Sequence, residues 1–267
     1  MIKSNLTWAR APIRVFLATL LLGGLGGHAS EPPQTQAPDT RAGGRKQVLI
    51  VTGEDHRAHR WQETTPLLRT LLAQDDRLDV SVVEDLGFLR SPEIHHQAAI
   101  VMHFKNYDPK IPGRAGYENL TKFVERGGGL VIVHFASGAF QEFKDDFVKT
   151  AGRVWDPKRR GHDPYGKFTV NIVNDDHPVT QGLDDFETAD ELYTCLDGET
   201  PIQILADAES KVDRQRYPMA LVLKCGSGRV FHTPLGHDVS ALSNSGTAEL
   251  IRRGTAWVAG LEPAWRQ

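Results

Sequence analysis

The stretch Gly-Gly-Gly-Leu-Val-Ile-Val-His-Phe-Ala-Ser-Gly-Ala-Phe, residues 127–140, decides the fold of this chain. Its run Leu130–Val133 is apolar and mostly β-branched, which is typical of a parallel strand buried on both faces. Ser137 and Gly138 then indicate the start of a helix, so the strand ends at His134. Ligands of parallel α/β sheets bind at the carboxyl ends of the strands. We therefore expect His134 to lie in a ligand site.

Strands and helices alternate on both sides of this stretch. Helical spacing of apolar residues predicts helices from about Thr64, around Tyr117–Val124 and at Gly246–Val258. Short apolar runs predict strands at residues 48–51, 80–83, 100–104, 168–173, 202–206, 220–223 and 229–232. The alternation predicts the α/β class, with a doubly wound, mostly parallel sheet that has helices on both faces and an antiparallel edge.

The first residues predict export. Lys3, Arg10 and Arg14 precede an apolar run at 15–25, and small residues follow at Gly27 and Ala29. We therefore expect a signal peptide at 1–29, a flexible leader at 30–46 and one domain at 47–262, in a periplasmic or secreted protein. An uncleaved membrane anchor is the alternative, but the apolar run is short for a membrane span. We expect no membrane association after cleavage.

Charge and motifs exclude two classes of partner. Removal of residues 1–29 takes three of the 31 basic side chains and none of the 34 acidic ones, so the net charge becomes 28 minus 34, or −6. The one dense basic cluster, Lys158–Arg160, is typical of a solvated loop, and we expect no nucleic-acid binding. The sequence has no Gly-x-Gly-x-x-Gly or Walker-type loop, so we expect no nicotinamide or nucleotide.

Cys195 and Cys225 leave two alternatives open. An oxidising compartment would allow them to form a disulfide, and two separate thiols are the other interpretation. Neither belongs to a CxxC pair or adjoins a histidine, so we expect neither thiol catalysis nor a zinc knuckle.

Polar side chains follow several predicted strands. The loops at the carboxyl edge of one sheet meet in one place, so these side chains can share a cleft although they lie far apart in the sequence. The candidates are Asp55, His59, His134, Ser137, Glu191, His237 and Asp238.

Five motifs in order resemble the ThuA-like (trehalose-utilisation) family over about residues 47–261. They are Thr-Gly-Glu-Asp-His at 52–56, the glycine-rich strand and turn at 127–139, His-Pro-Val-Thr-Gln-Gly-Leu at 177–183, Asp-Glu-Leu-Tyr at 190–193 and Gly-Arg-Val-Phe-His-Thr-Pro-Leu-Gly-His-Asp at 228–238. The resemblance implies a flavodoxin-like fold similar to class I glutamine amidotransferases. It also implies a role in sugar catabolism, with a 3-keto-glycoside made by a partner sugar dehydrogenase as the expected substrate.

The sequence departs from the amidotransferases at the catalytic turn. Those enzymes have an activated cysteine there, whereas this turn begins at His134 and contains no thiol, which excludes glutamine hydrolysis through a thioester. Ser137 has only half of the pattern that surrounds a serine nucleophile. We expect it to cap the following helix or to donate a hydrogen bond to the ligand.

Two mechanisms fit the candidate residues. His134, His237 and His59 could act as acids and bases on a sugar, with Glu191 or Asp55 orienting an imidazole. Imidazoles and a carboxylate could equally hold a divalent metal such as zinc. The metal hydrolase and a non-catalytic carbohydrate-binding module remain alternatives to the acid-base enzyme.

A second group of residues is expected to bind the substrate. His162 belongs to a loop that could reach over the cleft, and Tyr193 could stack on a sugar ring, although most aromatic residues belong to the core. Ser137 and Asp238 complete this group. The sequence leaves the oligomeric state open, a homo-oligomer included.

Overall fold

The computed structural model describes residues 44–56 and 58–263. The expected signal peptide and almost all of the expected leader therefore lie outside the described residues. No helix in the described ranges is long and apolar enough to cross a membrane.

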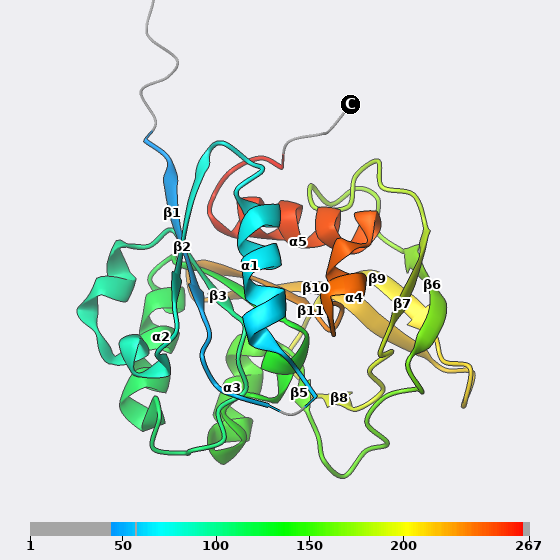
Figure 1. The fold of residues 1–267 in the computed structure, drawn as a ribbon, viewed down its shortest axis with the longest axis horizontal. Coiled ribbons are helices and arrows are strands. Elements are labelled where there is room, and N and C mark those ends of the chain that lie inside the picture. Colours follow the sequence, from blue (N-terminus) through cyan, green and yellow to red (C-terminus); the bar gives the residue numbers. More distant parts are fainter. Residues whose placement is uncertain (1–43, 57, 264–267) are drawn as a thin grey trace, which may run out of the picture. The chain divides into compact units, whose positions relative to one another are not determined.

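Nine strands of the described chain form one sheet (Figure 1). In spatial order they are β2 (Leu78–Val83), β1 (Lys46–Val51), β3 (Ala99–Met102), β4 (Gly129–Val133), β11 (Gly228–Thr233), β10 (Arg216–Cys225), β9 (Gln203–Glu209), β6 (Gly166–Ile172) and β7 (Phe186–Asp190). The first five are parallel, and each of the last four is antiparallel to its neighbours. The expected α/β sheet with an antiparallel edge is confirmed.

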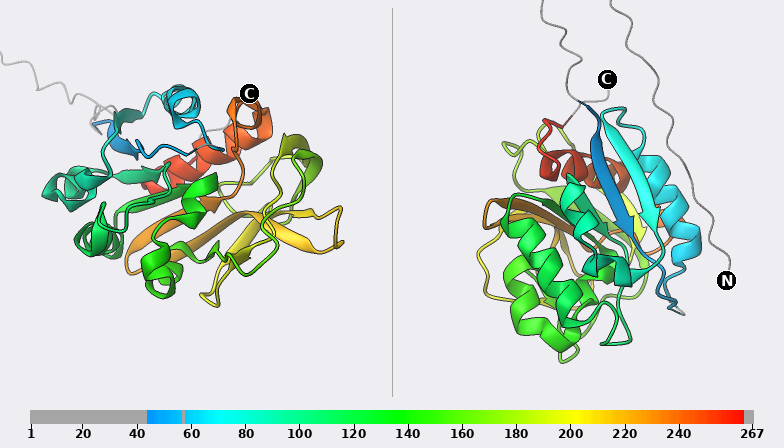
Figure 2. Two further views of the ribbon diagram at one scale, coloured as in Figure 1. Left: turned by 60° about the horizontal axis from the view of Figure 1, so that its bottom comes forward. Right: turned by 90° about the vertical axis from the view of Figure 1, so that its left-hand side faces the viewer.

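Helices cover both faces of the sheet (Figure 2). They are α1 (Trp61–Leu72), α2 (Gly113–Glu125), α3 (Lys144–Ala151), α4 (Val239–Ser243) and α5 (Ser245–Val258). Side chains of a strand point alternately to opposite faces. Accordingly Val131 and Val133 of β4 pack in the core that α1 and α5 cover, while Leu130 and Ile132 pack in the core that α2 and α3 cover. The strand is thus buried on both faces, as its composition predicts.

The antiparallel part of the sheet curls back towards the parallel part. β7 is the last strand of the sheet, yet it contacts α4 and α5, which pack on the parallel half. Pairing of β10 with β9 shifts register between Pro218 and Leu221, and such bulges bend a strand. The curl brings the end of β7 near the centre of the sheet, where the functional side chains lie.

The segment after β4 differs from the expected helix. Residues 134–138 form a 3₁₀ turn, residues 141–143 form another, and the α-helix begins only at Lys144. Phe140 has left-handed backbone, with φ of 53°, and its buried ring packs against Phe104 and Phe147. Burial of this ring requires a break in the helix, so Ser137 does not cap α3.

Smaller differences occur elsewhere. β1 begins at Lys46, one residue inside the expected leader, and the sequence pattern predicts neither β7 nor α4. A short pair, β5 (Val154–Trp155) and β8 (Leu196–Asp197), lies outside the main sheet. Further 3₁₀ turns occupy residues 86–90 and 92–96. Cys195 and Cys225 are both free thiols.

Candidate functional site

The turn after β4 holds His134 in a strained conformation. Its φ is 47°, a left-handed value that is costly for a residue other than glycine. Ser137 Oγ donates a hydrogen bond to the carbonyl of His134 (2.6 Å), and His134 Nδ1 donates to the carbonyl of Pro234 after β11 (2.7 Å). With the proton on Nδ1, the lone pair of Nε2 points away from the sheet towards a group of polar side chains.

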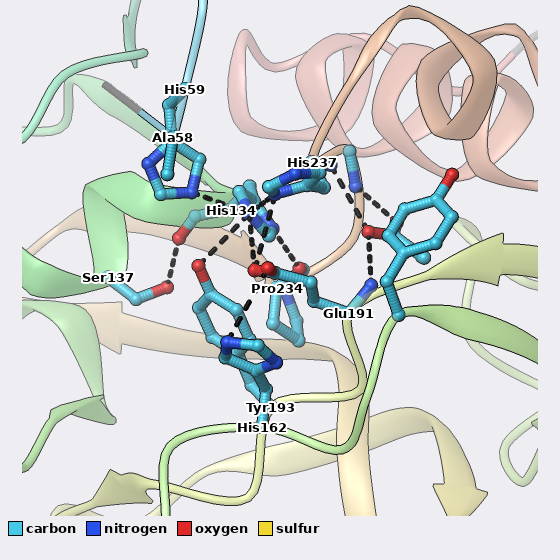
Figure 3. Close-up of polar contacts among 12 residues, drawn as sticks. Ala58, His59, His134, Ser137, His162, Glu191, Tyr193, Pro234 and His237 are labelled. Atoms are coloured by element: carbon cyan, nitrogen blue, oxygen red, sulfur yellow. Dashed lines mark hydrogen bonds and ion pairs between the residues drawn. The ribbon is translucent and has the colours of Figure 1, made fainter. Parts of the chain in front are cut away.

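Four side chains from four segments converge there (Figure 3). His59 follows β1, His134 follows β4, Glu191 follows β7 and His237 follows β11. We call these four residues the His-Glu cluster. His134 Nε2 lies 3.1 Å from His59 Nε2, 3.2 Å from His237 Nδ1 and 3.5 Å from Glu191 Oε2. His237 Nδ1 lies 3.2 Å from Glu191 Oε2, and one donor atom from each residue lies within 4.8 Å of the other three.

The environment fixes the charges of the His-Glu cluster. Burial and the neighbouring imidazoles lower the pKa of His59 to about 2, so its ring is neutral. Burial opposes ionisation of Glu191, but hydrogen bonds from His134 and His237 outweigh it and lower the pKa of the carboxyl group. Burial would lower the pKa of His237, but the hydrogen bond and the charge of Glu191 raise it. The cluster therefore presents neutral imidazole beside an ionised carboxylate.

Two of the expected substrate-binding residues lie next to the cluster. The hydroxyl of Tyr193 is 3.0 Å from His134 Nε2, and His162 Nε2 is 3.4 Å from Glu191 Oε1. Burial and the negative charge of Glu191 raise the pKa of Tyr193 well above its usual value, so the phenol keeps its proton.

Three other expected residues lie outside the cluster. Asp55 is exposed, and its Oδ1 accepts hydrogen bonds from the side chains of Trp61 (2.8 Å) and Gln62 (2.7 Å). Asp238 accepts a hydrogen bond from the amide of Ala241 at the start of α4. Ser137 is fully buried below the turn. Its contacts support the fold of the turn, and the structure places none of these three groups with the imidazoles.

Ser137 also touches a buried histidine. Its Oγ is 2.8 Å from His232 Nε2, and His232 Nδ1 is 3.1 Å from the carbonyl of Ala151. Both side chains are fully buried, so the pair has no access to a substrate.

Sequence reasoning missed Asp190, which positions two members of the cluster. This fully buried carboxylate accepts hydrogen bonds from the amides of Gly236 (2.7 Å), His237 (3.2 Å) and Glu191 (2.8 Å). It thereby ties the end of β7 to the loop after β11. The only available signal was its place in the Asp-Glu-Leu-Tyr motif.

A cavity of about 200 Å³ opens beside the cluster. It is lined by His56, Ala58, His59, Lys105, Phe135, Gly138, Trp155, His162, Glu191 and Tyr193. Pockets for drug-sized ligands measure roughly 300–1,000 Å³, so this one suits a single sugar unit better than a long chain. A larger cavity, of about 480 Å³, lies at the amino ends of β1, β3 and β4 and contains no member of the cluster.

The cluster fits a divalent metal ion. Four ligands in a tetrahedron around zinc, with bonds of about 2.0–2.1 Å, are separated by roughly 3.3–3.4 Å. The four distances above range from 3.1 to 3.5 Å. His134 Nε2 also has one lone pair but several close polar neighbours, which hydrogen bonds alone cannot satisfy. The carbonyl that accepts from His134 Nδ1 is the support usual for a metal-bound imidazole.

The fold and the site define a flavodoxin-like α/β protein with a glutamine amidotransferase-like fold, in which a histidine stands at the catalytic turn. The model of the ThuA family, described as trehalose utilisation, matches residues 47–258. The chain therefore belongs to the ThuA family, and this membership supports a role related to carbohydrate in general.

Solved structures agree on the fold. A structure described as a ThuA-like protein of Parabacteroides merdae superposes with a TM-score of 0.74 and 24% identity, over 83% of this chain and 93% of that one. Another, of Bacteroides uniformis, gives 0.67 and 19%, over 84% and 95%. A structure from Thermoplasma acidophilum, described as part of a GMP synthase, gives 0.50 and 12%, over 81% and 94%. No curated protein matches the sequence.

Proposed function

We propose that this protein is an enzyme that acts on a carbohydrate at a divalent metal centre formed by His59, His134, His237 and Glu191. The proposal rests on one observation, the convergence of these four donor atoms within 4.8 Å from four separate segments. Three imidazoles and one carboxylate are typical ligands of zinc and related ions.

The chemistry of the centre suits a sugar with a carbonyl group. A divalent ion polarises a carbonyl oxygen or activates a bound water, and the cavity beside Glu191 and His59 gives a ligand access to it. Tyr193 and His162 lie on the cavity wall and could give or take the proton that such a reaction moves.

The substrate and pathway are finer parts of the same proposal. We propose a 3-keto-glycoside as the substrate, supplied by a partner sugar dehydrogenase, and an exported protein. The carbohydrate description of the family supports the first part. The basic and apolar pattern of residues 1–29 supports the second.

The contact between His237 and Glu191 favours a second candidate, acid-base catalysis without a metal. The carboxylate raises the pKa of His237, as expected for an imidazole that delivers a proton. In this candidate the same residues act directly on the sugar.

Elemental analysis and turnover of a 3-keto-glycoside separate the candidates. We expect one equivalent of a divalent metal in the purified protein, its loss in both His134→Ala and His237→Ala, and loss of turnover on chelation with recovery on metal addition. His96→Ala, an exposed histidine outside the site, is the control that retains metal and turnover.

Other outcomes would contradict the metal proposal. Turnover by metal-free protein that still requires His237 and Glu191 would establish the acid-base candidate. Sugar binding without turnover under any metal condition would establish a carbohydrate-binding module.

A further inference from the structure

Lys105 lies in the same cavity but outside the His-Glu cluster. It follows β3 by three residues, and its side chain lines the cavity beside Gly138. A Cβ atom at Gly138 would lie 3.2 Å from Lys105 Cδ and 3.3 Å from Cε, so the absence of a side chain there leaves the lysine its space.

The ammonium group of Lys105 has aromatic neighbours and no acidic partner. Its Nζ lies 5.7 Å from the ring centre of Tyr107 and 5.8 Å from that of Trp155. Among residues 44–56 and 58–263, no hydrogen bond or ion pair to Nζ is formed. A half-buried ammonium without a counter-ion is costly, and burial accordingly lowers the pKa of Lys105.

No other group on the cavity wall balances this charge. The titratable groups that line the cavity besides Lys105 are three histidines, Glu191 and Tyr193. The carboxylate oxygens of Glu191 face His134, His237 and His162. Neutral sugars are usually bound by carboxylate and amide groups that accept their hydroxyl protons, and the described wall offers no further carboxylate.

An aromatic wall joins the lysine to the cluster. The ring of Trp155, near the ammonium, lies 5.0 Å from that of Tyr193, and the hydroxyl of Tyr193 lies 3.0 Å from His134 Nε2. A sugar at the cluster would therefore extend along Trp155, on which its apolar face can pack, before it reached Lys105.

We infer that the pocket takes a monosaccharide that carries an anionic group, a carboxylate or a phosphate, and that Lys105 binds this group at the end remote from the His-Glu cluster. This inference rests on the proposed carbohydrate function and names its substrate class. Lys105 is thus a specificity-determining residue, and the aromatic wall sets the distance between the anion and the reacting carbon.

Binding measurements on the full chain test this assignment. The probes are D-glucuronate and D-galacturonate for a carboxylate, glucose 6-phosphate for a phosphate, and glucose and galactose as neutral references. We expect at least one anionic probe to bind about tenfold or more tightly than its neutral counterpart, as one charge-assisted hydrogen bond allows. The tighter anion identifies the group.

The matched variants are Lys105→Met, Lys105→Arg and Lys167→Met. Lys105→Met should remove the preference and leave affinity for the neutral sugars within about twofold, while Lys105→Arg should keep part of it. Lys167 forms an exposed pair with Glu187, so Lys167→Met should behave as the wild type. Equal affinities of anionic and neutral sugars, no binding of any anion, or an unchanged preference in Lys105→Met would overturn the inference.

Metal content separates this inference from the proposed function. An anion preference that depends on Lys105 in a protein that never binds metal or turns over a sugar would leave the inference standing and remove the enzyme. A metal-loaded, active protein without the preference would do the reverse.

Discussion

The positions of single side chains in the His-Glu cluster depend on a residue that does not reach the cavity. Asp190 is buried and accepts hydrogen bonds from three backbone amides, two of which belong to Glu191 and His237. A carboxylate has acceptor capacity for all three, whereas an asparagine would turn an N–H group towards some of these donors.

We therefore expect Asp190→Asn to lower the free energy of unfolding by about 1–3 kcal/mol, because buried amides lose their acceptor. Metal content should fall with it, because Glu191 and His237 are no longer held. Urea unfolding and elemental analysis measure the two effects, and Asp176→Asn, at an exposed turn position, is the control. Wild-type stability together with wild-type metal content would show that Asp190 positions nothing.

The sequence predicts some residues of the site and not others for a physical reason. His134 could be predicted because a strand end fixes its place in space. Asp55 and Asp238 follow strands as well, but a tryptophan indole and a helix amide bind their carboxylates. The rotation of a loop decides such cases. Lys105 has no motif, and its role depends on neighbours that the sequence does not reveal.

Among the elements, α5 contains a buried group of charges. Glu249 receives hydrogen bonds from Arg252 (2.6 Å) and Arg253 (2.6 Å), and both arginines are almost fully buried. Burial opposes ionisation of Glu249, but the two guanidinium groups outweigh it and lower the pKa of the carboxyl group.

This pKa predicts how stability depends on pH. Since the pKa is lower in the folded state, the pair stabilises the fold above the unfolded value of about 4.3, and the stabilisation is lost as the pH falls through the lower, folded value. At pH 7 we expect Glu249→Gln to cost about 1–3 kcal/mol of unfolding free energy, and the difference from wild type to shrink in acid.

Urea unfolding between neutral and acidic pH measures this effect. The control is Glu187→Gln, which breaks an exposed pair with Lys167 and should change stability little at any pH. A Glu249→Gln deficit that is constant with pH would mean that packing, and not charge, is responsible.

The predictability of the elements follows their burial. The strands of the parallel half are apolar runs buried on both faces, and the sequence predicts them. β7 reads Phe-Glu-Thr-Ala-Asp and lies at the edge of the sheet, so its pattern is too polar to indicate a strand. The helix after β4 begins later than its sequence pattern predicts because burial of Phe140 interrupts it.

At the scale of the described domain, the metal centre would link four distant segments. An ion that binds only the folded state stabilises it by about 2.7 kcal/mol at a concentration a hundred times its dissociation constant. For a domain of this size that amounts to roughly 5–10 °C in Tm.

We therefore expect chelation to lower the Tm of the wild-type protein by about this amount, and re-addition of metal to restore it. Scanning calorimetry with and without chelator measures the shift. His134→Ala should already melt low and should not respond to chelator. An equal response of both proteins would indicate that chelation acts outside the His-Glu cluster.

The curl of the sheet has a consequence for how the centre is assembled. β7 is the fifth strand along from β4, so in a flat sheet Glu191 would lie roughly 24 Å from His134, at about 4.8 Å per strand. The three imidazoles belong to the parallel half, and only closure of the antiparallel half delivers the negative charge that neutralises a cation. Metal uptake should thus be the last event of maturation, and a loaded centre certifies that both halves of the chain have met.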